Sequence, residues 1–116
     1  MQFHEVTFDG ATPVDGYGPG FFRIADEVTH GPILLTAARL ISWDGKDSAP
    51  IEALAGEIDV LFFGTGPETA YAPKALREAL EAKGVGVEPM ATPAACRTYN
   101  VLLAEGRRIA LAALPV

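Results

Sequence analysis

The sequence holds few of the residues that build disulfides, zinc sites or basic surfaces. Cys96 is its single cysteine and has no partner for an internal disulfide, and two histidines beside it make no zinc-binding pattern. Lysine and arginine number 9 against 15 aspartate and glutamate residues, which gives a formal net charge of −6. Nucleic acid is bound through a basic stripe, and the only basic doublet is Arg107-Arg108, so a nucleic-acid partner is not expected.

Long hydrophobic runs are scarce as well. The longest are Ile33–Leu35, Val60–Phe63 and Ile109–Leu114, whereas a membrane-spanning helix needs roughly 18 apolar residues. The first residues, MQFHEVTFDG, lack a basic segment followed by an apolar one, so no secretory signal is predicted. Together with the single cysteine, these absences favour a cytoplasmic location.

The first fifty residues predict a β-rich subdomain. The whole chain of 116 residues is 49% hydrophobic, which predicts one globular domain over residues 1–116. A strand is predicted at Gln2–Phe8, followed by a turn-rich loop at Asp9–Pro19. Further strands are predicted at 20–26, 27–31, 32–37 and 39–43, ended by the turn signal Asp44-Gly45. Because these strands are closely spaced, neighbours are expected to pair antiparallel.

After residue 50 the predicted order becomes strand, helix, strand, helix, strand. The run Val60–Phe63 is of the kind that is buried on both faces by flanking helices. A helix is predicted over Pro73–Lys83 and a strand over Val85–Met90. Thr92 is the predicted N-cap of a second helix that ends near residue 105. A last strand at Arg108–Leu114 completes a βαβαβ unit, which predicts a small parallel sheet within an α/β fold.

The carboxyl ends of such parallel strands are where open α/β sheets bind ligands. At this edge the turn Gly64–Gly66 follows one strand, and the helix start at Thr92 follows the next. Backbone amides of a Gly-x-Gly turn and of a helix N-terminus favour an anion, and Arg97 lies about one turn into that helix. The predicted ligand-binding residues are therefore Gly64, Thr65, Gly66, Thr92, Arg97 and Asn100.

The same glycines also have a purely structural explanation. A dinucleotide-binding loop requires a third glycine where this chain has Thr69, and a P-loop requires lysine and a hydroxyl residue where it has Pro67 and Glu68. Glu68 would also repel a phosphate. Glycine lets a crowded chain leave a buried strand with positive φ, which needs no ligand. The loop therefore carries no nucleotide motif, and both explanations stay open.

Cys96 is the one candidate nucleophile of the second predicted helix. It shares a helix face with apolar residues such as Leu103, where a lone cysteine is usually a small core residue. A nucleophile needs a general base, and both histidines, His4 and His30, belong to the other half of the chain. No pair of carboxylates has the spacing of an acid–base dyad or a metal site. Catalytic residues, metal ligands and cofactors are therefore not predicted, and Trp43 is predicted as a core or rim aromatic whose exposure would indicate a protein partner.

Several segments together resemble a known family. They are VLFFGTG, ISWDG and KGVGVEPMATPAACRTYNVLLAEGRRIALAALP, and their most specific residues are Met90, Thr92, Ala95, Arg97, Thr98, Tyr99, Asn100 and Glu105-Gly106-Arg107. These segments resemble the Mth938-like family, also called the DUF498 family. The resemblance implies a three-layer α/β fold with a mixed sheet and an extra β-rich subdomain. It implies no established catalytic activity or cofactor, and the mitochondrial relatives act as helper proteins in the assembly of respiratory complex I.

Three functions follow, in order of preference. The first is a non-catalytic assembly or protein-interaction factor, linked by the resemblance to complex I. The second is a protein that binds a small molecule or anion at the edge formed by Gly64–Gly66 and Thr92–Arg97. The third is an enzyme built on Cys96 or Arg97. The sequence does not predict the oligomeric state.

Overall fold

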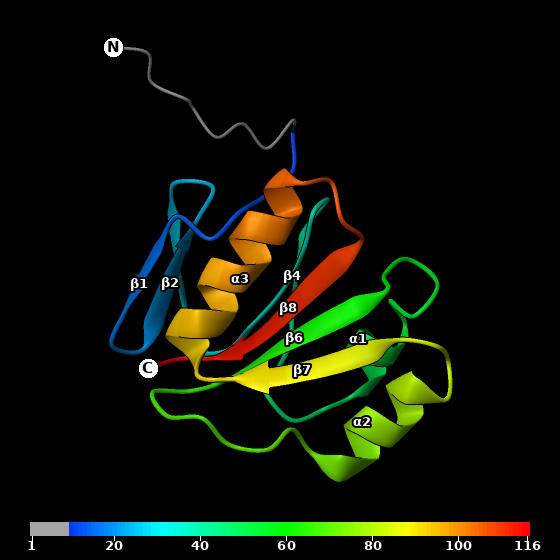
Figure 1. Cartoon of the computed structure of the whole chain (residues 1–116). Helices are drawn as coiled ribbons and strands as arrows, with labels where there is room; N and C mark the ends of the chain where they lie inside the picture. The colour runs from blue at the N-terminus through cyan, green and yellow to red at the C-terminus, as the bar shows by residue number, and fades with distance from the viewer. Residues whose placement is uncertain (1–9) are drawn as a thin grey trace.

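A computed structural model of the protein describes residues 10–116, so the strand predicted at Gln2–Phe8 lies outside the described residues. Within them the chain forms eight strands and three helices (Figure 1). In chain order these elements are β1 (Gly16–Gly18), β2 (Phe21–Ile24), β3 (Glu27–His30), β4 (Ile33–Thr36), β5 (Leu40–Ile41), α1 (Ala49–Glu52), β6 (Val60–Thr65), α2 (Lys74–Glu81), β7 (Gly86–Met90), α3 (Thr92–Ala104) and β8 (Ile109–Leu114).

The strands form two sheets. In the small sheet, β1, β2 and β3 pair antiparallel in that order, with Tyr17 opposite Phe22. The main sheet has the order β5-β4-β8-β6-β7, in which β6 runs parallel to both β8 and β7 while β4 runs antiparallel to β8. The predicted parallel unit is confirmed, and the main sheet is mixed as the resemblance implied. Antiparallel pairing of neighbours is confirmed for β2 with β3 and for β4 with β5, but it is wrong for β3 and β4, which lie in different sheets.

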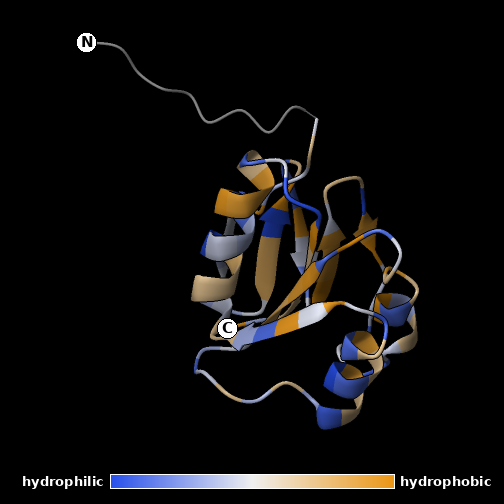
Figure 2. Cartoon of the chain, turned by 45° about the vertical axis from the view of Figure 1, so that its right-hand side comes forward, coloured by the Kyte–Doolittle hydropathy of each residue, from blue (hydrophilic) through white to orange (hydrophobic). Residues whose placement is uncertain are grey.

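The molecule has three layers with the main sheet in the middle. Side chains of β6 alternate between the two faces of this sheet: Leu61 and Phe63 pack with α1 and α2, whereas Phe62 packs with α3 and the small sheet. Figure 2 shows that hydrophobic residues dominate the central strands, while hydrophilic residues line the outer side of α2. The buried Leu76 and Leu80 of α2 face the sheet, as the apolar spacing of that helix predicted.

The strand order explains why α2 and α3 lie on opposite faces. The chain steps from β6 to its neighbour β7, and then returns past β6 to β8 on the other side. Because crossovers between parallel strands share one hand, steps in opposite directions place their helices on opposite faces. The carboxyl ends of β6 and β7 therefore lie where the two helices diverge, which is the position at which open α/β sheets form a crevice.

Two local elements differ from the sequence-based expectation. Strand β1 lies inside the segment 9–19 that was predicted as a loop, since its glycines mask a strand that is stabilised by pairing with β2. The short helix α1 was not predicted, and it places the buried Ile51 against the main sheet. Both elements depend on contacts with distant segments rather than on a repeating local pattern.

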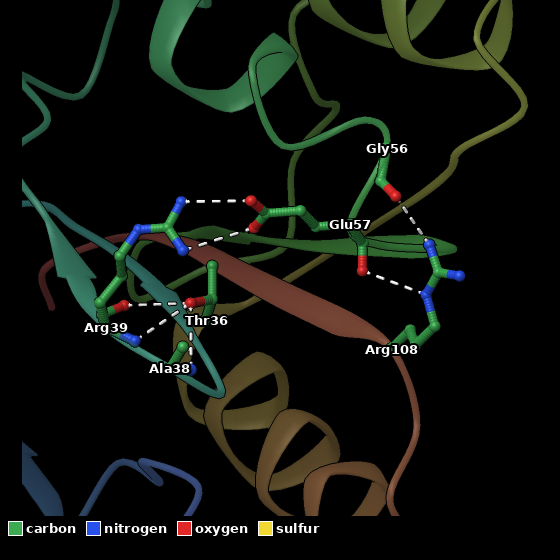
Figure 3. A network of polar contacts seen from close by, with 6 residues as sticks. All are labelled: Thr36, Ala38, Arg39, Gly56, Glu57 and Arg108. Carbon is green, nitrogen blue, oxygen red and sulfur yellow. Dashed lines mark hydrogen bonds and ion pairs between the residues drawn. The ribbon is translucent and has the colours of Figure 1, made fainter.

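The end of the main sheet opposite the crevice is closed by polar contacts (Figure 3). Arg39 and Glu57 form an exposed ion pair with an N–O distance of 3.4 Å. Arg108 donates from Nε to the carbonyl of Glu57 at 3.1 Å and from Nη2 to that of Gly56 at 3.0 Å. One half of the Arg107-Arg108 doublet therefore joins the loop before β6 to the start of β8.

Candidate functional site

The two predicted junctions at the carboxyl ends of β6 and β7 do meet. The Thr92 N–H donates to the Gly66 carbonyl at 2.8 Å, and the Gly66 N–H donates to the Thr92 hydroxyl oxygen at 2.9 Å. The same hydroxyl donates to the Leu114 carbonyl at the end of β8, at 2.6 Å. The fully buried Thr92 thus joins the ends of all three parallel strands.

Thr92 does this from inside the helix. The N-cap of α3 is Ala91, so Thr92 is the first helical residue, and its predicted capping role is wrong by one position. Its hydroxyl forms no cap hydrogen bond and turns toward the strands instead. Pro93 still occupies the first turn, where its missing N–H costs no helical hydrogen bond.

Gly64 and Gly66 are required by geometry at this junction. A Cβ built on Gly64 would lie 2.8 Å from the Thr92 hydroxyl oxygen and 3.0 Å from the Ala113 Cβ, closer than side chains pack. Gly66 has φ +99°, a conformation that other residues rarely adopt. These glycines let the start of α3 approach the strand ends.

Thr65 folds the following loop onto the same junction. Its hydroxyl lies 2.6 Å from the Glu68 carbonyl and 3.2 Å from the Met90 carbonyl, and it accepts the Ala70 N–H at 3.1 Å. We name Gly64, Thr65, Gly66 and Thr92 the strand-end cluster. The polar groups of this cluster already have hydrogen-bond partners within the chain. An anion could therefore bind the Gly66 amide only by displacing the hydroxyl of Thr92.

The other two predicted site residues, Arg97 and Asn100, lie elsewhere. They line a hollow of about 450 Å³ between α3 and the start of the small sheet. We name this hollow the α3–β1 groove; its lining residues are Val14, Asp15, Gly16, Tyr17, Pro93, Cys96, Arg97, Asn100 and Val101. The structure therefore divides the predicted site into a filled cluster and an open groove.

Asn100 positions one wall of the groove. Its side-chain oxygen accepts the Val14 N–H at 2.9 Å, and its amide nitrogen donates to the Val14 carbonyl at 2.8 Å. Just before it in the sequence, the buried Tyr99 donates its hydroxyl to the Thr12 carbonyl at 2.9 Å. Burial raises the pKa of Tyr99, so this donor keeps its proton at neutral pH. Asn100 thus serves to hold the segment before β1 against α3.

Charges of opposite sign lie on the two sides of the groove. Arg97 is exposed on α3, and within residues 10–116 no ion pair joins it to a carboxylate. Asp15 is exposed before β1, and its carboxylate accepts the Asp26 N–H at 3.4 Å. Both charged groups remain available to a bound molecule.

Cys96 lies on the groove side of α3 but is only 3% exposed. Burial raises the pKa of its thiol to about 12, so the thiol is protonated at neutral pH and is a poor nucleophile. Among residues 10–116, none that lines the groove is a histidine, and His30 lies on β3 with its ring packed edge-on against Phe21. In the part of the chain that the structure describes, no cluster of three or more histidine, cysteine or carboxylate groups has metal-site geometry.

The sequence missed the wall of the groove that β1 supplies. Tyr17 was hidden in a predicted loop, and Val101 drew no attention although an apolar residue on the outer side of α3 is a detectable signal. Trp43, in contrast to Tyr17 and Val101, is only 8% exposed, and it donates Nε1–H to the Asp47 carbonyl at 2.8 Å. Trp43 is therefore a core residue, as predicted, and the exposure that would have indicated a protein partner is not observed.

Comparison with known proteins assigns these features to a family. The family described as a protein of unknown function (DUF498/DUF598) matches residues 14–114. An uncharacterised protein of Rhodobacter capsulatus is 52% identical over 117 residues, covering 100% of this chain and 94% of the relative. The NADH dehydrogenase (ubiquinone) 1 alpha subcomplex assembly factor 3 of Danio rerio is 30% identical over 112 residues, covering 90% of this chain and 64% of that protein.

The fold is similar to solved structures as well. The solution NMR structure of a Mth938-like domain from Bordetella pertussis superposes with a TM-score of 0.81 and 27% identity, covering 99% of this chain and 92% of that chain. Among the described residues, no helix is long and apolar enough to cross a bilayer. The resemblance read from the sequence is confirmed, and the chain belongs to the DUF498 family with its Mth938-like α/β fold.

Proposed function

We propose that this chain is a non-catalytic factor that binds a protein partner during the assembly of respiratory complex I. The observation that carries the proposal is the 30% identity to a complex I assembly factor over 90% of this chain. The chain spans 64% of that relative, and the family match over residues 14–114 contains both the strand-end cluster and the α3–β1 groove. The proposal places this activity in the cytoplasm, which suits a chain with one cysteine.

The chemistry of the groove supports binding rather than catalysis. Its cysteine is protonated and buried, and its asparagine is committed to the backbone of Val14. The other lining residues are mostly apolar, with one acidic side chain, Asp15, and one basic side chain, Arg97. Such a lining suits recognition of another protein surface. A factor that holds a partner in place needs no reacting group.

Deletion of the gene in its source organism tests the proposal. We expect less fully assembled complex I on native gels and a matching loss of membrane NADH:quinone oxidoreductase activity, both restored by the intact gene. Succinate dehydrogenase activity serves as the control, because general damage to the respiratory membrane would lower it too. Unchanged complex I in the deletion strain would refute the complex I role.

A further inference from the structure

We propose that the α3–β1 groove binds an extended peptide segment of a partner protein, one that presents a bulky apolar side chain next to an acidic residue. The inference rests on the proposed function only in that it names the surface through which a partner is held. Four features point to this occupant: an edge strand, a helix wall, two exposed apolar side chains, and an arginine that has no carboxylate partner among the described residues.

An edge strand forms one side of the groove. Strand β1 is the first of the order β1-β2-β3, so within residues 10–116 only one of its edges is paired. An unpaired edge offers backbone N–H and C=O groups to an added strand, and the adjoining hollow takes alternate side chains of that strand. The two hydrogen bonds between the Asn100 side chain and the Val14 backbone fix the start of this edge against α3. The peptide would therefore meet a preformed surface, which lowers the entropy cost of binding.

Exposed apolar side chains converge on the groove. Among the described residues, five large hydrophobic side chains are exposed, namely Tyr17, Val28, Leu40, Tyr71 and Val101. Tyr17, 42% exposed, and Val101, 54% exposed, lie on opposite walls of the same hollow although they are far apart in the chain. Binding is favourable when one apolar side chain of the peptide covers both Tyr17 and Val101, because it removes their apolar surface from water.

The charges select the sequence of the peptide. Arg97 has no carboxylate partner within the described residues, in a protein with six more acidic than basic side chains (15 against 9). A peptide carboxylate would complete a charge-assisted pair with its guanidinium. Asp15 on the other wall disfavours a second acidic group at that side, so one acidic residue in a fixed position is preferred over a generally acidic peptide.

Peptide selection against the full-length protein tests the proposal. The probe is a displayed library of short random peptides, selected on the immobilised protein and then synthesised singly. We expect enriched peptides to carry a bulky apolar residue beside glutamate or aspartate, and to lose about tenfold or more in affinity for Val101→Glu. Tyr71→Glu is the matched control, because Tyr71 is 93% exposed outside the groove lining, and this variant should keep wild-type affinity.

Charge reversal and NMR mapping make the test specific. Arg97→Glu should weaken the selected peptide, and replacing the acidic residue of that peptide by lysine should recover affinity for Arg97→Glu alone. On peptide binding, changes in the backbone amide signals of the wild-type protein should concentrate at 14–18 and 94–101. Failure to enrich any peptide, equal affinity for Val101→Glu and wild type, or shifts centred elsewhere would each overturn the proposal. Thermal unfolding of each variant shows whether it is folded, and a misfolded Val101→Glu is replaced by Val101→Ser.

The two proposals fail in distinguishable ways. Gene deletion could lower the amount of complex I, and a gene carrying Val101→Glu could restore it fully in the deletion strain. In that case the assembly role stands, and the groove is not the surface that binds the partner. If deletion leaves complex I intact while selected peptides bind the groove, the groove stands and the client belongs to another pathway.

Discussion

The strand-end cluster and the α3–β1 groove contain residues that the sequence groups as one site, yet they differ in how their polar groups are matched. In the cluster the hydroxyl of Thr92 satisfies Gly66 and Leu114 at once, so polar groups find partners inside the chain. In the groove Arg97 and Asp15 remain exposed beside the apolar Tyr17 and Val101. Polar backbone groups at a strand end are thus open to a ligand only where the protein's own side chains leave them unpaired.

The same comparison separates the roles of neighbouring residues on one helix. Thr92 and Tyr99 of α3 are fully buried and bond to backbone carbonyls, whereas Arg97 and Val101 of the same helix face solvent. The buried side of α3 closes the fold, and its outer side forms a groove wall. Substitutions on the two sides should therefore change different measurable properties.

The largest loss in the free energy of unfolding is expected for a substitution at Gly64. Gly64→Val would push a branched side chain into Thr92 and Ala113, and overpacking of this kind costs about 3 kcal/mol. Urea unfolding measures the loss. Gly56→Val is the control, because a Cβ there meets nothing within 4 Å and its φ is not positive. Equal stability of the two variants would show that the strand-end cluster is loosely packed and open to a ligand.

A smaller effect is expected at Thr92. Thr92→Val keeps the shape of the side chain but leaves the Gly66 N–H and the Leu114 carbonyl without this hydroxyl, which costs about 2 kcal/mol. Thr92→Ser retains the hydroxyl and should lose less, as chemical denaturation of both proteins would reveal. A Thr92→Val protein as stable as the wild type would mean that these groups find other partners.

The small sheet, whose strand β1 lines the groove, can be stabilised through the turn that joins β2 to β3. Ala25 and Asp26 have φ of 52° and 64°, so this two-residue turn requires the left-handed conformation at both positions. Asparagine followed by glycine suits such a turn best, so the double substitution Ala25→Asn with Asp26→Gly should stabilise the protein by about 1 kcal/mol. Thermal unfolding checks this gain, and Ala25→Val should do the opposite.

The smallest effect on stability at neutral pH is expected from the ionisation of Cys96, at the floor of the groove. Burial raises the pKa of Cys96 to about 12 from 9.0, so the native state keeps a proton that the unfolded state loses as the pH rises. The contribution of this thiol to stability is constant below about pH 9 and is lost between about pH 9 and 12, which unfolding curves of wild type and Cys96→Ala would separate. Slow alkylation at neutral pH is expected as well, and rapid stoichiometric labelling would show that the groove opens down to Cys96.

Much of the second half of the chain is predictable because its signals are local. The continuous apolar run at β6, the apolar spacing of α2 and the proline after Thr92 each lie within one element and predict that element. The bounds shift by a few residues: α2 is observed at Lys74–Glu81 where 73–83 was predicted. Helix ends are less certain because the last turn is stabilised by few hydrogen bonds.

The candidate site was less predictable because its contacts span long stretches of chain. The sequence identified Arg97 and Asn100 as site residues but assigned them to the edge at Gly64–Gly66. It contains no signal for the partner of Asn100, which is Val14, 86 positions away in the chain. Pairing with β2 converts the glycine-flanked Tyr17 into a strand residue. No local pattern reports such a pairing.

The amino-acid pattern predicts the βαβαβ order, the buried faces of α2 and α3 and the meeting of Gly66 with Thr92, because residue spacing and crossover geometry dictate them. Packing between distant segments determines two further features: the strands of the first half divide between two sheets, and Thr92 occupies the crevice while the space beside Arg97 stays open. The physical reason is that a backbone amide or an apolar side chain finds its final partner only when distant segments pack together.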